Sequence, residues 1–116
     1  MAPNEDIHYK TIFDLAPLIQ ARKLSAVELT TAQLERIERL DPALKSFATV
    51  TADLALQQAR IADEQIANSG YLGPLHGIPV AVKDLCNTAG IRTMGGSSVF
   101  ADNVPDQDAT VVTRLY

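Results

Sequence analysis

The chain has 116 residues, of which 47% are hydrophobic and 21% charged, and its formal net charge is −4. This composition is that of a globular protein of one domain at most. The acidic balance, without a cluster of Lys or Arg, argues against binding to a nucleic-acid backbone, and no apolar stretch is long enough to cross a bilayer. The single cysteine, Cys86, excludes an intrachain disulfide and, with the polar start of the chain, predicts a cytoplasmic protein.

The first predicted helix follows a short N-terminal segment. Residues 1–10 are predicted to be a loose arm, because chain ends are commonly poorly ordered. A helix is then predicted over about residues 12–22, with an apolar face made of Phe13, Leu15, Leu18 and Ile19. Pro17 is unfavourable in a helix interior, which favours a start near Asp14 that leaves the proline in the first turn.

A capping box marks the start of the second predicted helix. The Ser25 hydroxyl can accept a hydrogen bond from the Glu28 amide, and the Glu28 carboxylate can reach back to the backbone of Ser25. Thr30 lies between apolar residues at helical spacing, which are Val27, Leu34 and Ile37. The helix is predicted to end at Asp41-Pro42, because proline disfavours helical geometry in the residue before it.

The third predicted helix runs from Ala52 to about Asn68, with Thr51 as its N-cap. One face carries mainly small residues, namely Ala55, Ala59, Ala62 and Ile66. Such a face lets another backbone approach closely, so we interpret it as a surface for tight helix packing. Gly70 suits the left-handed position that commonly follows a helix.

Strands and loops are predicted for the remaining segments. Residues 78–82 form an apolar run that follows glycine and proline, which predicts a short buried strand, and residues 47–50 suit another. Residues 87–108 are rich in Gly, Ser, Asn and Asp and are predicted to be mostly loop. Asp108 is predicted to cap a last helix over residues 109–116. Helices that flank strands predict an α/β architecture.

Lys83 stands at the end of the predicted strand at residues 78–82. Its ammonium group either reaches water or is held in an apolar pocket, and residue type alone favours water. In a pocket, desolvation would lower the lysine pKa from about 10.4 by up to roughly 3–5 units. The neutral amine would then be a usable general base near pH 7.

The sequence around Lys83 reverses that preference. The run Gly73-Pro74-Leu75-His76-Gly77-Ile78-Pro79-Val80-Ala81-Val82-Lys83-Asp84 resembles the lysine motif of the amidase signature family. The resemblance continues through residues 88–90, 93–97 and 108–112, and upstream through residues 24–29 and 34–37, so it extends over nearly the whole chain.

The resemblance implies both a fold and a mechanism. The fold would be a mixed central sheet covered by helices, of which residues 1–116 are the N-terminal part of a single amidase domain, with the N-terminal helices and the first strand or strands. Lys83 would be the base of a Ser–cis-Ser–Lys triad that cleaves amides, with no cofactor and no metal. The two serines belong to a Gly/Ser-rich segment beyond Tyr116, so the isolated chain is expected to be inactive.

Several other reactive residues near Lys83 have simpler interpretations. Ser97 and Ser98 lie beside glycines, but they match a different segment of the family, so we interpret them as hydrogen-bonding loop residues. Asp84 follows the lysine directly and is interpreted as structural, because neighbours on a strand point to opposite faces. Cys86 is expected to be a small buried residue. His8 and His76 lack metal-ligand spacing and are expected in surface or loop roles.

Two other functions compete with amide hydrolysis. Val80-Ala81-Val82-Lys83 resembles the kinase motif V-A-I-K, but the glycine-rich loop that this motif requires is absent from the preceding segment. The alternative to an enzyme is a non-catalytic packing or interaction module, or a remnant of an amidase, because the chain holds no serine nucleophile of the expected kind.

The predicted substrate is a small-molecule amide, bound by the complete enzyme. Members of the family act on aliphatic, aromatic and fatty amides, on allophanate or malonamide, and on glutamine as a source of ammonia for misacylated tRNA. The sequence does not choose among them, because the pocket residues are expected beyond Tyr116. No nucleic-acid or membrane contact is predicted, and a homo-oligomer is left open.

Overall fold

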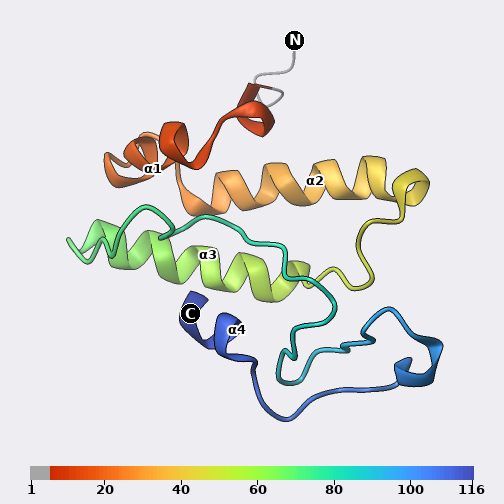
Figure 1. Cartoon of the computed structure of the whole chain (residues 1–116). Coiled ribbons are helices and arrows are strands. Elements are labelled where there is room, and N and C mark those ends of the chain that lie inside the picture. The colour runs from red at the N-terminus through yellow and green to blue at the C-terminus, as the bar shows by residue number, and fades with distance from the viewer. Residues whose placement is uncertain (1–5) are drawn as a thin grey trace. The chain divides into compact units, whose positions relative to one another are not determined.

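The computed structural model describes residues 6–116. The chain divides into two compact units, Met1–Pro79 and Val80–Tyr116 (Figure 1). The first unit holds a 3-10 turn, η1 (Asp6–Tyr9), and three α-helices, α1 (Ile12–Gln20), α2 (Ala26–Leu44) and α3 (Ala52–Ala67). The second unit holds the 3-10 turn η2 (Ser98–Phe100) and the helix α4 (Thr110–Leu115). Most of the second unit is irregular, as the sequence predicts for residues 87–108.

The predicted strands do not form, and residues 6–116 are helical with no strand. Residues 78–82 and 47–50 are irregular segments. A strand needs the backbone of a neighbouring strand for its hydrogen bonds, and here the Ile78 amide donates instead to the Leu75 carbonyl, 3.1 Å away, within a turn. The described residues 6–116 therefore do not show the strands of the α/β class expected for the fold.

Residues 6–9, which fall within the predicted loose arm, form a turn held to the first unit. Residues 6–9 form η1, and Ile7 packs against the main core. The guanidinium of Arg36 lies 5.2 Å from the centre of the Tyr9 ring, a cation–π contact that ties η1 to α2. The packing of the partly buried Ile7 and this contact hold residues 6–9 to the rest of the first unit. The remainder of the predicted arm, residues 1–5, lies outside the described residues.

Helix α1 begins at Ile12 and not near Asp14. The reason is a second capping box. The Thr11 amide donates to the Asp14 carboxylate at 2.9 Å, and the Asp14 amide donates to Oγ1 of Thr11 at 3.3 Å. Pro17 consequently lies inside the helix, where its missing N–H removes one helical hydrogen bond. The spacing of Thr11 and Asp14 was the signal in the sequence that could have placed this start.

Helix α2 has the predicted capping box. The Glu28 amide donates to Oγ of Ser25 at 3.0 Å, and the Ser25 amide donates to the Glu28 carboxylate at 2.8 Å. The helix does not end at Asp41-Pro42 but continues to Leu44, where Lys45 takes a left-handed conformation with φ of 52°. The Asp41 carboxylate accepts from the amide of Ser46 at 2.6 Å, and this bond stabilises the extra turn.

Helices α2 and α3 lie side by side in the first unit (Figure 1). Their contact uses the small-residue face predicted for α3, because Ala59 and Ala62 are buried against Ala26. Residues of α1, α2 and α3 form the main core, which consists of Leu15, Ile19, Leu29 and Ile66. Removal of this apolar surface from water is the principal stabilising term for the unit.

Helix α3 spans Ala52–Ala67, close to its predicted bounds, although Thr51 makes no side-chain capping bond. Ser69, and not Gly70, takes the left-handed conformation, with φ of 64°. The Gly70 amide donates to the Gln65 carbonyl at 2.8 Å. A Cβ atom at Gly70 would lie 2.9 Å from that carbonyl oxygen, so the glycine is needed for close approach.

The predicted cap of the last helix has another role. Helix α4 follows Ala109, and its N-terminus has no side-chain capping bond. The Asp108 carboxylate instead accepts a hydrogen bond from the Ala89 amide at 2.7 Å. The side chain thus connects the two ends of the long loop within the second unit.

Candidate active site

The segment that leads to Lys83 leaves the first unit through a closely packed glycine. Gly77 has φ of 83°, and a Cβ atom there would lie 3.0 Å from Cβ of Ala26 and 3.4 Å from Cγ2 of Ile19. Any larger residue would require Ala26 or Ile19 to shift slightly and would be strained at this positive φ. The next residue, Ile78, packs against the main core. Close packing therefore holds the backbone of residues 77 and 78 in place near the end of the first unit.

Lys83 itself lies at the start of the second unit, and its side chain is exposed. Its carbonyl accepts a hydrogen bond from the Cys86 amide at 2.9 Å, which closes a four-residue turn. The turn fixes the backbone at Lys83 and leaves the amine free to project outward. The apolar pocket considered for this amine is not formed by the described residues.

Asp84 connects the turn at Lys83 to the loop at residues 94 and 95, which is the kind of structural role predicted for it. Its carboxylate accepts from the Met94 amide at 3.0 Å, and its carbonyl accepts from the Gly95 amide at 2.7 Å. These bonds occupy one carboxylate oxygen and the backbone carbonyl. Asp84 therefore fixes the backbone directly after Lys83.

Ser97 and Ser98 behave as hydrogen-bonding loop residues. Oγ of Ser97 accepts from the Val99 amide at 3.3 Å and caps η2. The Ser98 side chain is exposed, and its carbonyl accepts from the Ala101 amide at 3.2 Å. Among the hydrogen bonds of residues 6–116, none joins either serine to Lys83. The geometry gives no support to a Lys83–serine pair within this chain.

His76 orders the loop before Lys83, as its predicted loop role requires. Nδ1 accepts from the Leu72 amide at 3.1 Å, so the ring proton is on Nε2, which donates to Oε1 of Gln65 at 2.9 Å. The ring also stacks on Tyr71, with centroids 6.0 Å apart. Both ring nitrogens are engaged, which leaves the histidine without a free acceptor for catalysis.

The remaining reactive residues form no further site. Cys86 is a free, half-buried cysteine, and His8 is half-buried in η1. In the part of the chain that the structure describes, no three His, Cys, Asp or Glu side chains could together hold a metal ion. No described helix is long and apolar enough to span a membrane.

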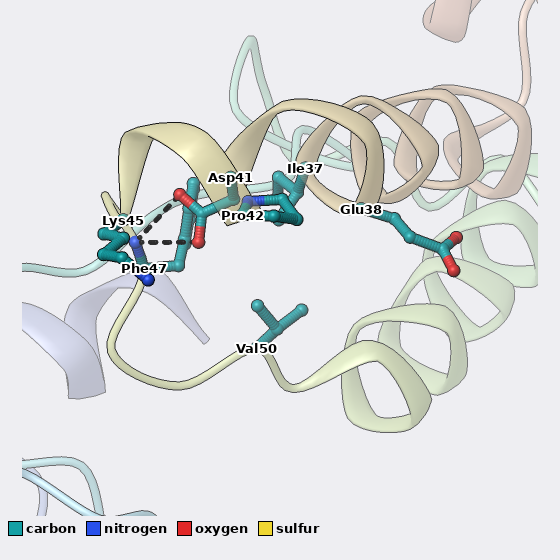
Figure 2. Close-up of a pocket in the computed structure, with 7 residues that line it drawn as sticks. All are labelled: Ile37, Glu38, Asp41, Pro42, Lys45, Phe47 and Val50. Carbon is teal, nitrogen blue, oxygen red and sulfur yellow. Dashed lines mark hydrogen bonds between the residues drawn. The ribbon is translucent and has the colours of Figure 1, made fainter.

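An open hollow lies where α2 ends and the chain turns toward α3 (Figure 2). It measures about 540 Å³ and is lined by Ile37, Glu38, Asp41, Pro42, Lys45, Phe47 and Val50. The Asp41 carboxylate is occupied by backbone amides, including that of Phe47 at 3.3 Å. Lys83 is not among the lining residues, so this hollow is not the candidate site. The sequence contains no signal for this hollow, because its lining combines apolar, acidic and basic residues that match no recognised motif.

Comparisons with known proteins agree on one family. The Amidase family model matches residues 28–116. The chain is 53% identical over 109 residues to the A-subunit of glutamyl-tRNA(Gln) amidotransferase from Methylococcus capsulatus, covering 94% of this chain and 22% of that protein. It is 51% identical over 102 residues to the protein named Putative amidase AmiD of Mycobacterium tuberculosis, covering 88% of this chain and 22% of that one.

A solved structure has a similar fold. It is a chain from work on a vestigial protein complex that reveals the evolutionary origins of an s-triazine catabolic enzyme, and it matches with a TM-score of 0.86 and 28% identity. The match covers 91% of this chain and 23% of that one. The chain spans about a fifth of the length of the curated relatives it matches. With the Amidase model matched over residues 28–116, the chain belongs to the amidase signature family.

Proposed function

We propose that this chain supplies Lys83 as the general base of a serine amide hydrolase. The single observation that carries the proposal is the position of Lys83. It lies within the matched residues 28–116, on a backbone fixed by the Cys86 turn and by Asp84. A base must be held in place to remove a proton efficiently, and a fixed backbone with a free amine meets that requirement.

The surroundings of Lys83 suit an amine that is buried by further polypeptide. Its apolar neighbours are exposed, with 52% of Val80, 41% of Val82 and 62% of Leu85 accessible to solvent. Polypeptide packed on these side chains would remove water from around the amine. Desolvation disfavours the charged form of a lysine, which is the condition that a lysine base needs.

In the proposed mechanism, the neutral Lys83 amine accepts a proton from a bridging serine. That serine takes the proton of a second serine, whose oxygen attacks the amide carbon. The amine product leaves with a proton returned through the same chain of groups, and water then releases the acid from the acyl-enzyme. Both serines are expected in a segment that this chain does not include, and backbone amides beside the nucleophile would stabilise the oxyanion.

The substrate class is a carboxamide, and two kinds are in question. One is a small amide that is simply hydrolysed. The other is glutamine, favoured by the 53% identity to a protein named as part of an amidotransferase. The protein of full natural length should be assayed for ammonia release from glutamine and from simple aliphatic and aromatic amides. A kcat/KM for glutamine well above the others would favour the amidotransferase role.

The test of the proposal is Lys83→Ala in the protein of full natural length. The amide-cleavage rate should fall at least about a hundredfold, which is the usual contribution of a positioned acid–base group. Lys83→Arg should be equally impaired, because a guanidinium does not lose its proton in proteins. Lys23→Ala, at another exposed lysine, is the matched control and should leave the rate unchanged. A near-normal rate for Lys83→Ala would remove Lys83 from the mechanism.

A non-catalytic packing module is the alternative. We expect the 116-residue chain alone to hydrolyse no amide, because Ser97 and Ser98 are not paired with Lys83. Turnover by this chain that disappears in Ser97→Ala or Ser98→Ala would contradict the proposal. If the protein of full natural length neither bound nor cleaved an amide, that result would support the interpretation of this chain as part of a non-catalytic packing module.

A further inference from the structure

Two hydrogen bonds hold Asp84 to the loop at residues 94 and 95, and all three residues lie in the second unit. Oδ1 of Asp84 accepts from the Met94 amide at 3.0 Å, and its backbone carbonyl accepts from the Gly95 amide at 2.7 Å. The first bond depends on the side chain, whereas the second would form with any residue at this position. The Met94 bond is partly buried, so its loss would leave an amide that water reaches less easily than at an exposed site.

The loop that Asp84 contacts is itself held within the same unit. The Thr93 amide donates to the Asn103 carbonyl at 2.9 Å, and Nδ2 of Asn103 donates to the Thr93 carbonyl at 2.9 Å. Thr93 is buried, with 5% of its surface exposed. The loop also approaches Leu85, because a Cβ atom at Gly95 would lie 3.8 Å from Cδ2 of that residue. Asp84 is therefore bonded to a segment that has its own support.

Lys83 shares a peptide group with Asp84, so the two residues cannot move independently. The Lys83 carbonyl accepts from the Cys86 amide at 2.9 Å, and Asp84 is the second residue of the turn that this bond closes. A rotation of the backbone at Asp84 would move the Cα atom from which the lysine amine extends. Without the Met94 bond, only the Gly95 bond of the two described above would still join the turn to the loop.

We propose that Asp84 is a positioning residue for Lys83, and that it acts by accepting the Met94 amide and not through its negative charge. The inference rests on the proposed function, because it assumes that Lys83 is the base. In the described residues 6–116, the Asp84 carboxylate forms no ion pair with the Lys83 amine. Such a pair would favour the ammonium form and weaken the base. A displacement of about 1 Å at a catalytic group can reduce a rate by up to about a hundredfold.

The experiment compares three variants in the protein of full natural length. Asp84→Ala should lower kcat at least about tenfold with KM within about twofold, because Lys83 acts in the transition state and not in binding. Asp84→Asn keeps an acceptor oxygen for the Met94 amide and loses the charge, so its kcat should stay within about threefold of the original. Asp108→Ala is the matched control, because it removes another carboxylate that accepts a backbone amide in the same unit, that of Ala89 at 2.7 Å. Its kcat should stay within about twofold of the original.

Two results of this comparison would overturn the inference. Equal kcat losses in Asp84→Ala and Asp108→Ala would show a general loosening of the unit. A loss in Asp84→Asn as large as that in Asp84→Ala would show that the charge matters and not the hydrogen bond. If Asp84→Ala does not fold, Asp84→Ser takes its place, because its hydroxyl ends one bond short of Oδ1. Its kcat should fall at least about fivefold, and a normal kcat would overturn the inference.

A double variant tests whether Asp84 acts through Lys83. Asp84→Ala added to Lys83→Ala should change the residual rate of single-turnover acylation by less than about twofold, because the group to be positioned is already absent. A further tenfold fall in the double variant would overturn the inference, since Asp84 would then support another part of the site. Such a fall is what a merely structural role predicts.

The result for Lys83→Ala alone separates the two proposals. A normal rate for Lys83→Ala overturns the proposed function and this inference with it. An impaired Lys83→Ala beside a folded Asp84→Ala with normal kcat overturns only the positioning role of Asp84.

Discussion

At the scale of single residues, two carboxylates illustrate how local hydrogen bonds change protonation. Acceptance of bonds from the backbone and side chain of Ser25 lowers the pKa of Glu28 below its ordinary value of 4.5. The side chain and backbone of Thr11 likewise lower the pKa of Asp14 below 3.8. In each case the ionised form is the better acceptor for the N–H at the start of a helix.

These lowered pKa values predict a dependence of stability on pH. Because the folded pKa of Glu28 is below the unfolded one, its stabilising contribution is complete above about pH 4.5 and is lost as the pH falls through the folded pKa. Glu28→Gln should therefore reduce the loss of stability on acidification, by no more than about 1 kcal/mol for so exposed a group. Urea unfolding between about pH 3 and 7 measures this. Glu35→Gln, on the same helix, is the control, and an equal effect there would contradict the explanation.

The end of α3 offers a pair of substitutions with opposite effects. Ser69 is left-handed, with φ of 64°, so Ser69→Gly should stabilise the protein by about 0.5–1 kcal/mol. Gly70→Ala should destabilise it by more than about 1 kcal/mol, because the new Cβ would lie 2.9 Å from the Gln65 carbonyl oxygen. Denaturant midpoints of the two variants compare them directly. A stabilising Gly70→Ala would show that the backbone can move away.

Residue roles near Lys83 were largely predictable from the sequence. Asp84 and His76 have the structural roles expected of them, since their bonds are to nearby backbone and side-chain groups. The environment of the Lys83 amine was not predictable in the same way. Desolvation depends on what packs against Val80, Val82 and Leu85, and those residues are exposed here. Lys83 as the base therefore stays a prediction.

At the scale of elements, helices were predicted better than strands. A helix satisfies its hydrogen bonds within itself, so the Ser25 capping box was sufficient to place the start of α2, and the small-residue face from Ala55 to Ile66 was sufficient to place α3. A strand requires a partner, and the apolar run at residues 78–82 indicates burial without providing one. The extension of α2 past Pro42 was missed because it depends on the Asp41 side chain.

The last turn of α2 can be tested through Asp41. Its carboxylate accepts from the amides of Ser46 and Phe47, so Asp41→Ala should cost about 1 kcal/mol and fray the helix after residue 41. Hydrogen exchange at residues 45–47 should quicken. Asp41→Asn keeps one acceptor oxygen and should have a smaller effect. Unchanged exchange in Asp41→Ala would mean that helix propensity alone holds this turn.

At the scale of the molecule, the chain spans about a fifth of the length of its curated relatives, and many of its large apolar side chains are exposed. The exposed fractions reach 92% for Phe13, 81% for Leu72 and 83% for Val99. Large apolar side chains with this much exposure are available for contact with other protein. These side chains are the ones that further amidase polypeptide would cover in the proposed enzyme.

The 116-residue chain by itself should accordingly be only marginally stable. We expect it to bind a hydrophobic dye such as ANS and to unfold over a broad range of temperature, because large apolar side chains of both units are exposed to water. Calorimetry and dye fluorescence measure this. Sharp, reversible unfolding of a monomer that binds no dye would contradict the expectation.

The most direct test of Lys83 as the base is the rate of acyl-enzyme formation. The protein of full natural length and its Lys83→Ala variant would be mixed with an amide substrate and quenched at short times, and the acylated serine would be measured by mass spectrometry. We predict that acylation in Lys83→Ala slows at least about a hundredfold, because in the proposed mechanism Lys83 is the group that finally takes the serine proton. Acylation at an unchanged rate in that variant would contradict the role of Lys83 as the base.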